Sequence, residues 1–201
     1  MKRIVIFIIM FAGLVAAAFA ATPQQQLSAA AKKLSDAASV SATFTMKTNG
    51  GRGGQVRGSM QMARKACTVS AGGMTMWYDG TTQWVYSVAS QEVTVTRPEL
   101  ADLLESNPCV LISGYASHFN VSAGDGPCAV LTPKNKMSSG IESAKIWFDA
   151  AGWPSRIYVR FQSDSTIDVT VDKISVGKAM PASAFRFDAA KYPEADIIDL
   201  R

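Results

Sequence analysis

Few residues in this chain could carry out chemistry on a bound molecule. The 201 residues contain one histidine, His118, and the serine beside it, Ser117, is only its neighbour in sequence. A catalytic nucleophile needs a base held against it, and no G-x-S-x-G turn presents a serine in that way. Acidic residues such as Asp102 and Glu105 are scattered and form no catalytic pair. The sequence therefore predicts no catalytic residue, and esterase activity lost on Ser117→Ala would overturn that prediction.

The three cysteines, Cys67, Cys109 and Cys128, are the other reactive groups. Their spacing contains neither a C-x-x-C nor a His–Cys pattern, so we predict no metal site and no cofactor. Two interpretations of the cysteines stay open. In an exported protein two of them could form a disulfide, which leaves one thiol over. Alternatively, all three are small buried apolar side chains.

Methionines and one arginine form the most informative pattern. Five methionines fall within residues 46–76, and methionine is used where a surface must fit variable apolar partners. This favours a ligand cavity, with adaptable core packing as the alternative. In the strand predicted over 55–65, Met60, Met62 and Arg64 alternate onto one face. A cation there needs acceptors, so Arg64 either lies at the rim or meets partners at the cavity mouth, such as carbonyls at a helix C-terminus.

The elements that position these residues are mostly strands. Residues 24–38 have the apolar stripe of an amphipathic helix, with Thr22 and Pro23 as its cap and first-turn pair. From Ser39 onward the apolar period changes to two. We count about ten strands, all antiparallel, among them one over 68–78 and a last short one at Phe185 and Phe187. A bulge is expected at 172–173, where the apolar phase slips. Two short helices over 98–118 interrupt the strands. They form either a lid over a half-closed barrel or an ordinary covering layer over a packed core.

The N-terminal residues have the pattern of an export signal. Lys2 and Arg3 precede an apolar run that ends in Ala-Phe-Ala at residues 18–20, which predicts a signal peptide over 1–20 and one domain over 21–201. Without Lys2 and Arg3, 18 basic and 16 acidic residues leave a net charge of +2. No basic run interleaved with aromatic residues points to nucleic acid. We therefore predict an exported soluble protein that does not bind nucleic acid.

The order of several stretches resembles one known family, the periplasmic outer-membrane lipoprotein carriers (LolA-like chaperones), and most of all its Bacteroidota-type members. No single stretch is a strict motif, but together they run almost from end to end of the chain. The stretches are SATFTMKT, GSMQMARK, WYDGTTQWVY, NPCVLISGY, AVLTPK and FRFDAAKYPEADIIDLR.

The resemblance implies a mainly β fold, an incomplete antiparallel barrel covered by a helical lid and an N-terminal helix. Its cavity would hold the acyl chains of lipoproteins on their way to the outer membrane. An inner-membrane lipoprotein-releasing ABC transporter would load it, and the acceptor at the outer membrane is not implied by the sequence. Arg64 matches the position of a family arginine that latches the lid by bonding its backbone carbonyls. The family often has proline after that arginine, and here the residue is Lys65.

Strand phase and helical spacing then predict the residues of the site. The residues expected to line the cavity are Phe44, Met46, Met60, Met62, Met74, Met76, Trp84, Tyr86, Val93 and Val95. The residues expected on the lid are Leu100, Leu103, Leu104, Leu111 and Ile112. A bulge that the pattern does not reveal would move a whole set to the other face.

Three functions fit these expectations. The first is a lipoprotein carrier without enzymatic activity. The second is a periplasmic carrier or sensor of other lipids, such as fatty acid or glycolipid, on the same fold. The third is an interaction module whose barrel is filled by its own side chains. Competitive binding of a hydrophobic dye and fatty acid would speak against the third, and the identity of the cargo separates the first two.

Overall fold

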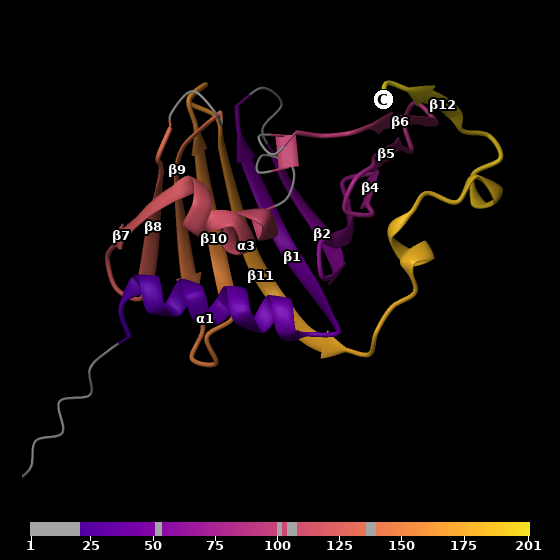
Figure 1. The fold of residues 1–201 in the computed structure, drawn as a ribbon. Helices are drawn as coiled ribbons and strands as arrows, with labels where there is room; N and C mark the ends of the chain where they lie inside the picture. Colours follow the sequence, from indigo (N-terminus) through magenta and orange to yellow (C-terminus); the bar gives the residue numbers. More distant parts are fainter. Residues whose placement is uncertain (1–20, 51–53, 100–101, 104–107, 136–139) are drawn as a thin grey trace, which may run out of the picture.

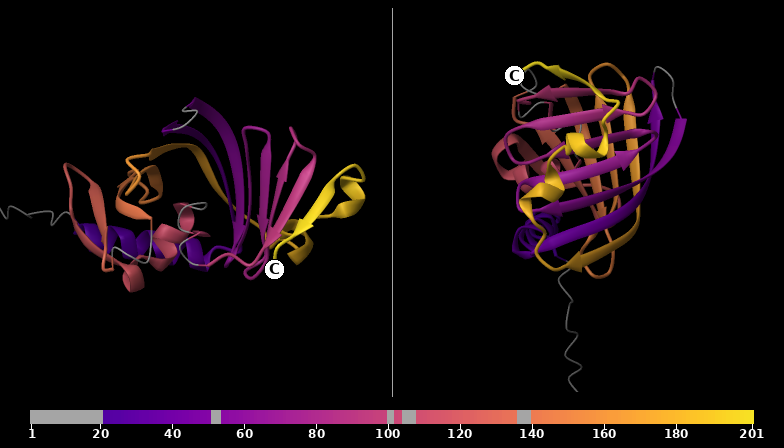
Figure 2. Two further views of the ribbon diagram at one scale, coloured as in Figure 1. Left: turned by 90° about the horizontal axis from the view of Figure 1, so that it is seen from above. Right: turned by 90° about the vertical axis from the view of Figure 1, so that its right-hand side faces the viewer.

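A computed structural model describes residues 21–50, 54–99, 102–103, 108–135 and 140–201. In this part of the chain twelve strands form one open sheet, and the two α-helices lie together against one of its faces (Figure 1). The predicted export signal, residues 1–20, lies outside the described residues. The sheet curves strongly, with the helices on its concave side (Figure 2). The predicted mainly β, incomplete barrel with covering helices is confirmed.

The helices are α1 (Pro23–Asp36) and α3 (Pro108–His118), and two short 3-10 helices, η1 (Ala182–Phe185) and η2 (Ala189–Lys191), follow near the C-terminus. The strands are β1 (Ser39–Asn49), β2 (Gly54–Ala63), β3 (Ala66–Ala71), β4 (Met74–Tyr78), β5 (Gln83–Ser87), β6 (Glu92–Thr96), β7 (Phe119–Ala123), β8 (Cys128–Pro133), β9 (Ile141–Phe148), β10 (Pro154–Phe161), β11 (Thr166–Gly177) and β12 (Asp196–Asp199).

The sheet is built from two meanders joined by one long-range pairing. Its order is β12-β6-β5-β4-β3-β2-β1-β11-β10-β9-β8-β7, and β1 and β11 join the two halves. All pairs are antiparallel except β12, which runs parallel to β6. The prediction of about ten strands, all antiparallel, is therefore wrong in this detail. A final strand at Phe185 and Phe187 was also expected, and the structure has η1 and an irregular segment there.

One expected strand, over residues 68–78, is in fact the hairpin of β3 and β4. Gly72 and Gly73 form its turn, with φ of 59° and 78°. Positive φ at two successive residues is the geometry that a tight hairpin requires, and glycine adopts it without strain. The glycine pair therefore reverses the chain where side-chain alternation alone suggested one continuous strand.

Helix α1 forms where the sequence predicts it, because its first turn is capped. The Thr22 hydroxyl accepts from the Gln25 backbone N–H at 3.2 Å, and the Gln25 side chain accepts from the Thr22 N–H at 2.9 Å. Pro23 occupies the first turn, where its missing N–H costs nothing. Leu27 and Leu34 are buried on the face turned toward the sheet. This fixes α1 across the half of the sheet that contains β7 and β8.

The bulge predicted at 172–173 is confirmed. Thr43 pairs with Lys173 and Phe44 with Val171, so Asp172 is the extra residue in β11. Such a residue changes the phase of a strand by one. Val171 and Ile174 consequently face the same side of the sheet although their numbers differ in parity.

Candidate functional site

The five methionines within residues 46–76 lie on the same face of the sheet. Directly paired residues of neighbouring strands point to the same side, and the register runs Ala42–Met60–Val69–Met76–Val85 across β1 to β5. This side also carries Phe44 and the residues of α1 and α3 that pack on the sheet. We call it the methionine face. Its methionines are Met46, Met60, Met62, Met74 and Met76.

The methionine face is only partly covered. Met62 and Met76 are buried, Met46 and Met60 are half-buried, and Met74 is 44% exposed. Helix α1 contacts α3, β7 and β8, which belong to the other half of the molecule. The methionine side of β2 to β5 is therefore an apolar surface on which Met60, Val69 and Val85 are only half-buried.

A glycine and an aromatic ring shape this surface. The ring of Phe44 lies over Gly58 on the neighbouring strand, and a Cβ at Gly58 would overlap Phe44 Cζ. It would also lie 2.7 Å from the backbone oxygen of Ser70. Only glycine allows this close packing, so the Phe44 ring packs directly on the backbone of Gly58.

The described part of the expected lid packs into the core. Leu111 and Ile112 of α3 are fully buried, and Leu103 is 9% exposed. The other two residues expected on the lid, Leu100 and Leu104, lie outside the described residues. Tyr115 links α3 to α1, because its hydroxyl accepts from the Gln24 amide at 3.4 Å. Helix α3 is thus a covering helix, and its role as a moving lid stays a prediction.

Four of the residues expected to line the cavity lie on the opposite, outer face of the sheet. Trp84, Tyr86, Val93 and Val95 form a second apolar cluster with Trp77, and Phe187 and Tyr192 from the C-terminal segment pack against it. We call this the outer cluster. Its rings are 4.6 to 5.8 Å apart between centroids. The expected cavity list thus divides between two faces.

The reason is the loop between β4 and β5. Tyr78 pairs with Gln83, which leaves four residues in the loop, so even-numbered residues of β4 share a face with odd-numbered residues of β5. The expected cavity residues of β5, Trp84 and Tyr86, are even-numbered like those of β4. The β5–β6 hairpin is therefore turned over as a unit, and Val85 takes the place on the methionine face that was expected for Trp84 or Tyr86. The structure pairs Trp77 with Trp84, so both side chains lie on the outer face. This pairing follows from the number of loop residues between β4 and β5, which the alternation pattern does not contain.

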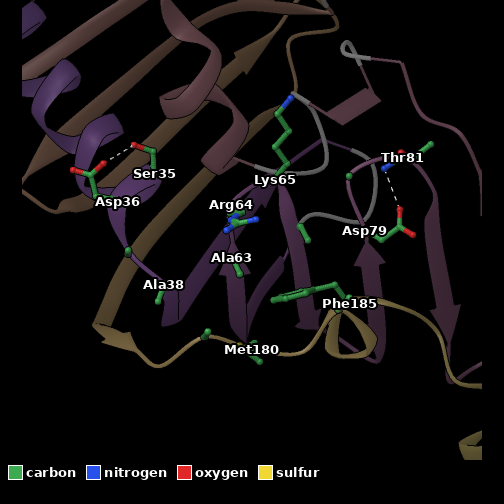
Figure 3. A pocket seen from close by; sticks show the side chains of 15 residues that line it. Ser35, Asp36, Ala38, Ala63, Arg64, Lys65, Asp79, Thr81, Met180 and Phe185 are labelled. Atoms are coloured by element: carbon green, nitrogen blue, oxygen red, sulfur yellow. Dashed lines mark hydrogen bonds between the residues drawn. The ribbon is translucent and has the colours of Figure 1, made fainter.

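Arg64 lies in the two-residue turn between β2 and β3. Its φ is 54°, and its side chain is exposed and makes no hydrogen bond or ion pair with the described residues. The turn lines an open pocket of about 850 Å³ together with the last residues of α1 and the segment that follows β11 (Figure 3). Part of the expected lid, including 104–107, lies outside the described residues. The predicted latch between Arg64 and the lid therefore stays a prediction.

Reactive side chains do not gather anywhere in the described ranges. Over these residues no three His, Cys, Asp or Glu side chains lie close enough to hold a metal ion. Cys67 and Cys128 are both 1% exposed, and burial raises the pKa of the Cys128 thiol. The side chain of Cys109 lies outside the description. His118 is the last residue of α3, and no described contact makes it a base for a nucleophile.

Comparison with known proteins decides the family. The model of the family "Outer membrane lipoprotein carrier protein LolA" matches residues 16–130, more than half of the chain. The chain belongs to the LolA family. No curated protein sequence matches it.

Two solved structures share the LolA-type fold with this chain. An uncharacterized conserved protein from Thermus thermophilus is 12% identical, with a TM-score of 0.55 over 88% of this chain and 98% of that chain. A LolA superfamily protein from Nitrosomonas europaea is 14% identical, with a TM-score of 0.51 over 84% of this chain and 99% of that chain. At these identities the likeness is one of fold.

Membership of the LolA family suggests a periplasmic carrier that binds lipids or lipoproteins. LolA-type carriers are typically not enzymes. No helix in the described part of the chain is both long and apolar enough to cross a bilayer.

Proposed function

We propose that this protein carries lipoproteins from the inner to the outer membrane by holding their acyl chains against the methionine face. The observation that supports this most is the partly exposed apolar surface of β2 to β5, where Met74 is 44% exposed while Met62 and Met76 are buried. Unbranched thioether side chains can repack around chains of different length and number. A carrier of this kind works by binding and needs no chemistry.

A carrier that buries acyl chains must also be able to release them, and the strength of the hydrophobic effect makes release difficult. Burial of one acyl chain of about 15 methylenes would contribute roughly 12 kcal/mol at ~0.8 kcal/mol per methylene. Several chains held that strongly would leave too slowly to be delivered. Contacts that close the empty site reduce the net affinity, because binding must first break them.

Arg64 is our candidate for such a closing contact. It projects from the β2–β3 turn, and its exposed guanidinium has no hydrogen-bond partner among the described residues. Carbonyl groups at a helix C-terminus accept hydrogen bonds from cations. In this proposal Arg64 bonds carbonyls of the lid when the site is empty and releases them when cargo binds. Arg64→Leu should then weaken the closed state and trap cargo.

In the proposed cycle the protein is a soluble periplasmic monomer, directed there by the signal peptide at 1–20. An inner-membrane lipoprotein-releasing ABC transporter transfers the acylated cargo to it. An acceptor at the outer membrane then removes the cargo.

The decisive experiment is a release assay. The mature protein is incubated with spheroplasts that carry newly made lipoproteins, and a soluble one-to-one complex with cargo is measured. We expect a complex with acylated cargo and none when the acyl chains are missing. Val85→Gln on the methionine face should lower the yield, whereas Val130→Gln, an equally half-buried valine on the outer face of β8, should not.

The other outcomes separate the alternatives. No release, with fatty acid still bound in solution, would favour a carrier or sensor of other lipids on the same fold. Neither activity would favour an interaction module with a filled barrel. If Arg64→Leu delivers cargo to the acceptor as fast as the unmodified protein, Arg64 is a rim residue and does not latch the lid.

A further inference from the structure

The open pocket at Arg64 lies away from the methionine face. Two of its wall residues, Ala63 and Ala66, pair with each other, and their side chains point to the outer side of the sheet because their neighbours Met62 and Cys67 face the methionine side. Met180 and Phe185 close the pocket from the segment after β11. The pocket therefore sits at the end of β2 and β3, between α1 and the C-terminal segment (Figure 3).

The walls of this pocket are small and apolar. Phe185, which is 3% exposed, and Met180 provide larger apolar side chains. Its volume of about 850 Å³ lies within the range of roughly 300 to 1,000 Å³ that small-molecule sites occupy. The six alanines that line it are Ala37, Ala38, Ala63, Ala66, Ala179 and Ala182.

Two acidic side chains, Asp36 and Asp79, and two basic ones, Arg64 and Lys65, line the pocket, and in the described ranges only the acidic ones have ion-pair partners. Asp36 is paired with Lys32 of its own helix at 2.6 Å. Asp79 is paired with Arg186 at 3.0 Å and accepts hydrogen bonds from two backbone N–H groups of its own loop. By contrast, Arg64 and Lys65 make no hydrogen bond or ion pair with any residue in the described ranges. The charge left for a ligand is positive.

We propose that this pocket binds a single-chain amphiphile with an anionic head, either a carboxylate or a phosphate. Arg64 and Lys65 would hold the head, and the alanines with Met180 and Phe185 would cover the first part of the chain. Charge-assisted hydrogen bonds from two cations favour an anion over a neutral head. The site is separate from the methionine face, so it gives the carrier a second ligand of a different kind from its proposed cargo.

The test compares anionic and neutral ligands of one chain length by calorimetry. The probes are palmitate, a palmitoyl lysophosphatidate, neutral monopalmitoylglycerol and inorganic phosphate. Arg64→Gln with Lys65→Gln should weaken both anionic amphiphiles by about tenfold or more and leave the neutral ester unchanged. Lys65→Gln alone should give part of this loss, and it leaves the proposed latch residue in place.

The chain offers a matched control for the loss of charge. Lys47 and Arg57 are exposed on β1 and β2, outside the pocket, and Lys47→Gln with Arg57→Gln removes the same charge. This control should keep the preference for anions. Raised salt should weaken palmitate in the unmodified protein and have little effect on the neutral ester.

Location is tested independently by NMR with a nitroxide-labelled fatty acid. We expect broadening of the methyl signals of pocket alanines such as Ala63 and Ala182. Broadening restricted to methionine methyls would overturn the proposal, as would an anion preference that survives in Arg64→Gln with Lys65→Gln. Phosphate that binds as tightly as the amphiphiles would also overturn it, since the apolar walls would then contribute nothing. Lipoprotein release is measured separately, so its failure would refute the carrier proposal and leave this one standing.

Discussion

The two faces of β4 and β5 differ in how they are covered, although the same strands form both. On the inner side Met76 is buried, but Val85 is half-buried and Met74 is exposed. On the outer side Trp77 and Tyr86 are buried beneath the C-terminal segment, which crosses this face in Figure 2. Aromatic rings with few rotamers fix the outer side, and flexible thioethers cover the inner side. An outer face packed with aromatic rings can thus hold the strands in place while the methionines of their inner face adapt.

The largest loss of stability is expected when the outer cluster loses a ring. Trp77→Ala removes the ring that packs at 5.6 Å from Phe187 and 5.8 Å from Tyr192, and it should lower the free energy of unfolding by about 3–5 kcal/mol. Urea denaturation measures this. Trp147→Ala is the control, because Trp147 is a half-buried ring of the outer face beside Arg156. Equal losses of unfolding free energy in the two variants would mean that the outer cluster stabilises the fold no more than the ring of Trp147 does.

The next largest loss of stability is expected where Phe44 packs on Gly58, on the inner face. Gly58→Ala places a methyl group that overlaps Phe44 Cζ and lies 2.7 Å from a backbone oxygen. We expect the free energy of unfolding to fall by about 1–3 kcal/mol, measured by thermal or urea denaturation. Gly54→Ala is the control on the same strand, since a Cβ there meets nothing within 4 Å. Similar stability of the two variants would contradict the close packing of Phe44 on Gly58.

A smaller effect concerns the tie between the β4–β5 loop and the C-terminal segment. Partial burial works to raise the pKa of Asp79, but the backbone N–H groups of Thr82 and Thr81 and the guanidinium of Arg186 outweigh it and lower the pKa. Asp79→Asn should therefore cost about 1 kcal/mol at pH 7.

This loss should depend on pH in one direction. Because the folded state lowers the pKa of Asp79, its contribution is present above the ordinary value of 3.8 and disappears as the pH falls through the lowered pKa. The difference between Asp79→Asn and the unmodified protein should thus shrink from pH 7 toward pH 3 in urea titrations. Asp36→Asn breaks only an exposed pair and should show almost no difference at pH 7. A constant gap for Asp79→Asn would refute the assignment.

The smallest change in stability is expected at Met74, on the methionine face. Met74→Ser should change the free energy of unfolding by less than about 0.5 kcal/mol, because Met74 is 44% exposed. It should nevertheless weaken a fluorescent acyl probe several-fold if the methionine face binds acyl chains. Leu200→Ser, at a residue 66% exposed beyond β12, should leave the probe unchanged. Equal probe affinity in both variants would separate Met74 from any binding role.

Much of the fold could be predicted from periodicity and capping. The stripe that ends in Leu27 and Leu34, the cap at Thr22 and the phase slip at Asp172 are local signals, and each has the predicted structure. The shared faces of Met60 with Met62 and of Met74 with Met76 also followed, since alternation within a strand is a local property. The parallel pairing of β12 with β6 did not follow, because no local pattern specifies which distant strand becomes the neighbour.

The site was predicted less completely because it depends on how strands are joined. The positions of Trp84 and Val93 relative to Met76 depend on the number of loop residues between β4 and β5, which side-chain alternation does not contain. The unneutralised charge at Arg64 and Lys65 depends on which partners Asp36 and Asp79 take. Such pairings arise from tertiary structure, so sequence pattern alone could suggest only that Arg64 was out of place on an apolar face.

The pairing of β1 with β11 has a consequence for how the chain reaches this structure. Each half of the sheet is a meander of neighbouring strands that can form early, whereas Ser39 must find Gly177 across most of the chain. Closing so large a loop costs entropy before any contact repays it, so we expect the two halves to form first and their union to limit the folding rate. Until then the edges of β1 and β11 are unprotected strands, and the delay is the period in which the chain is most exposed to aggregation.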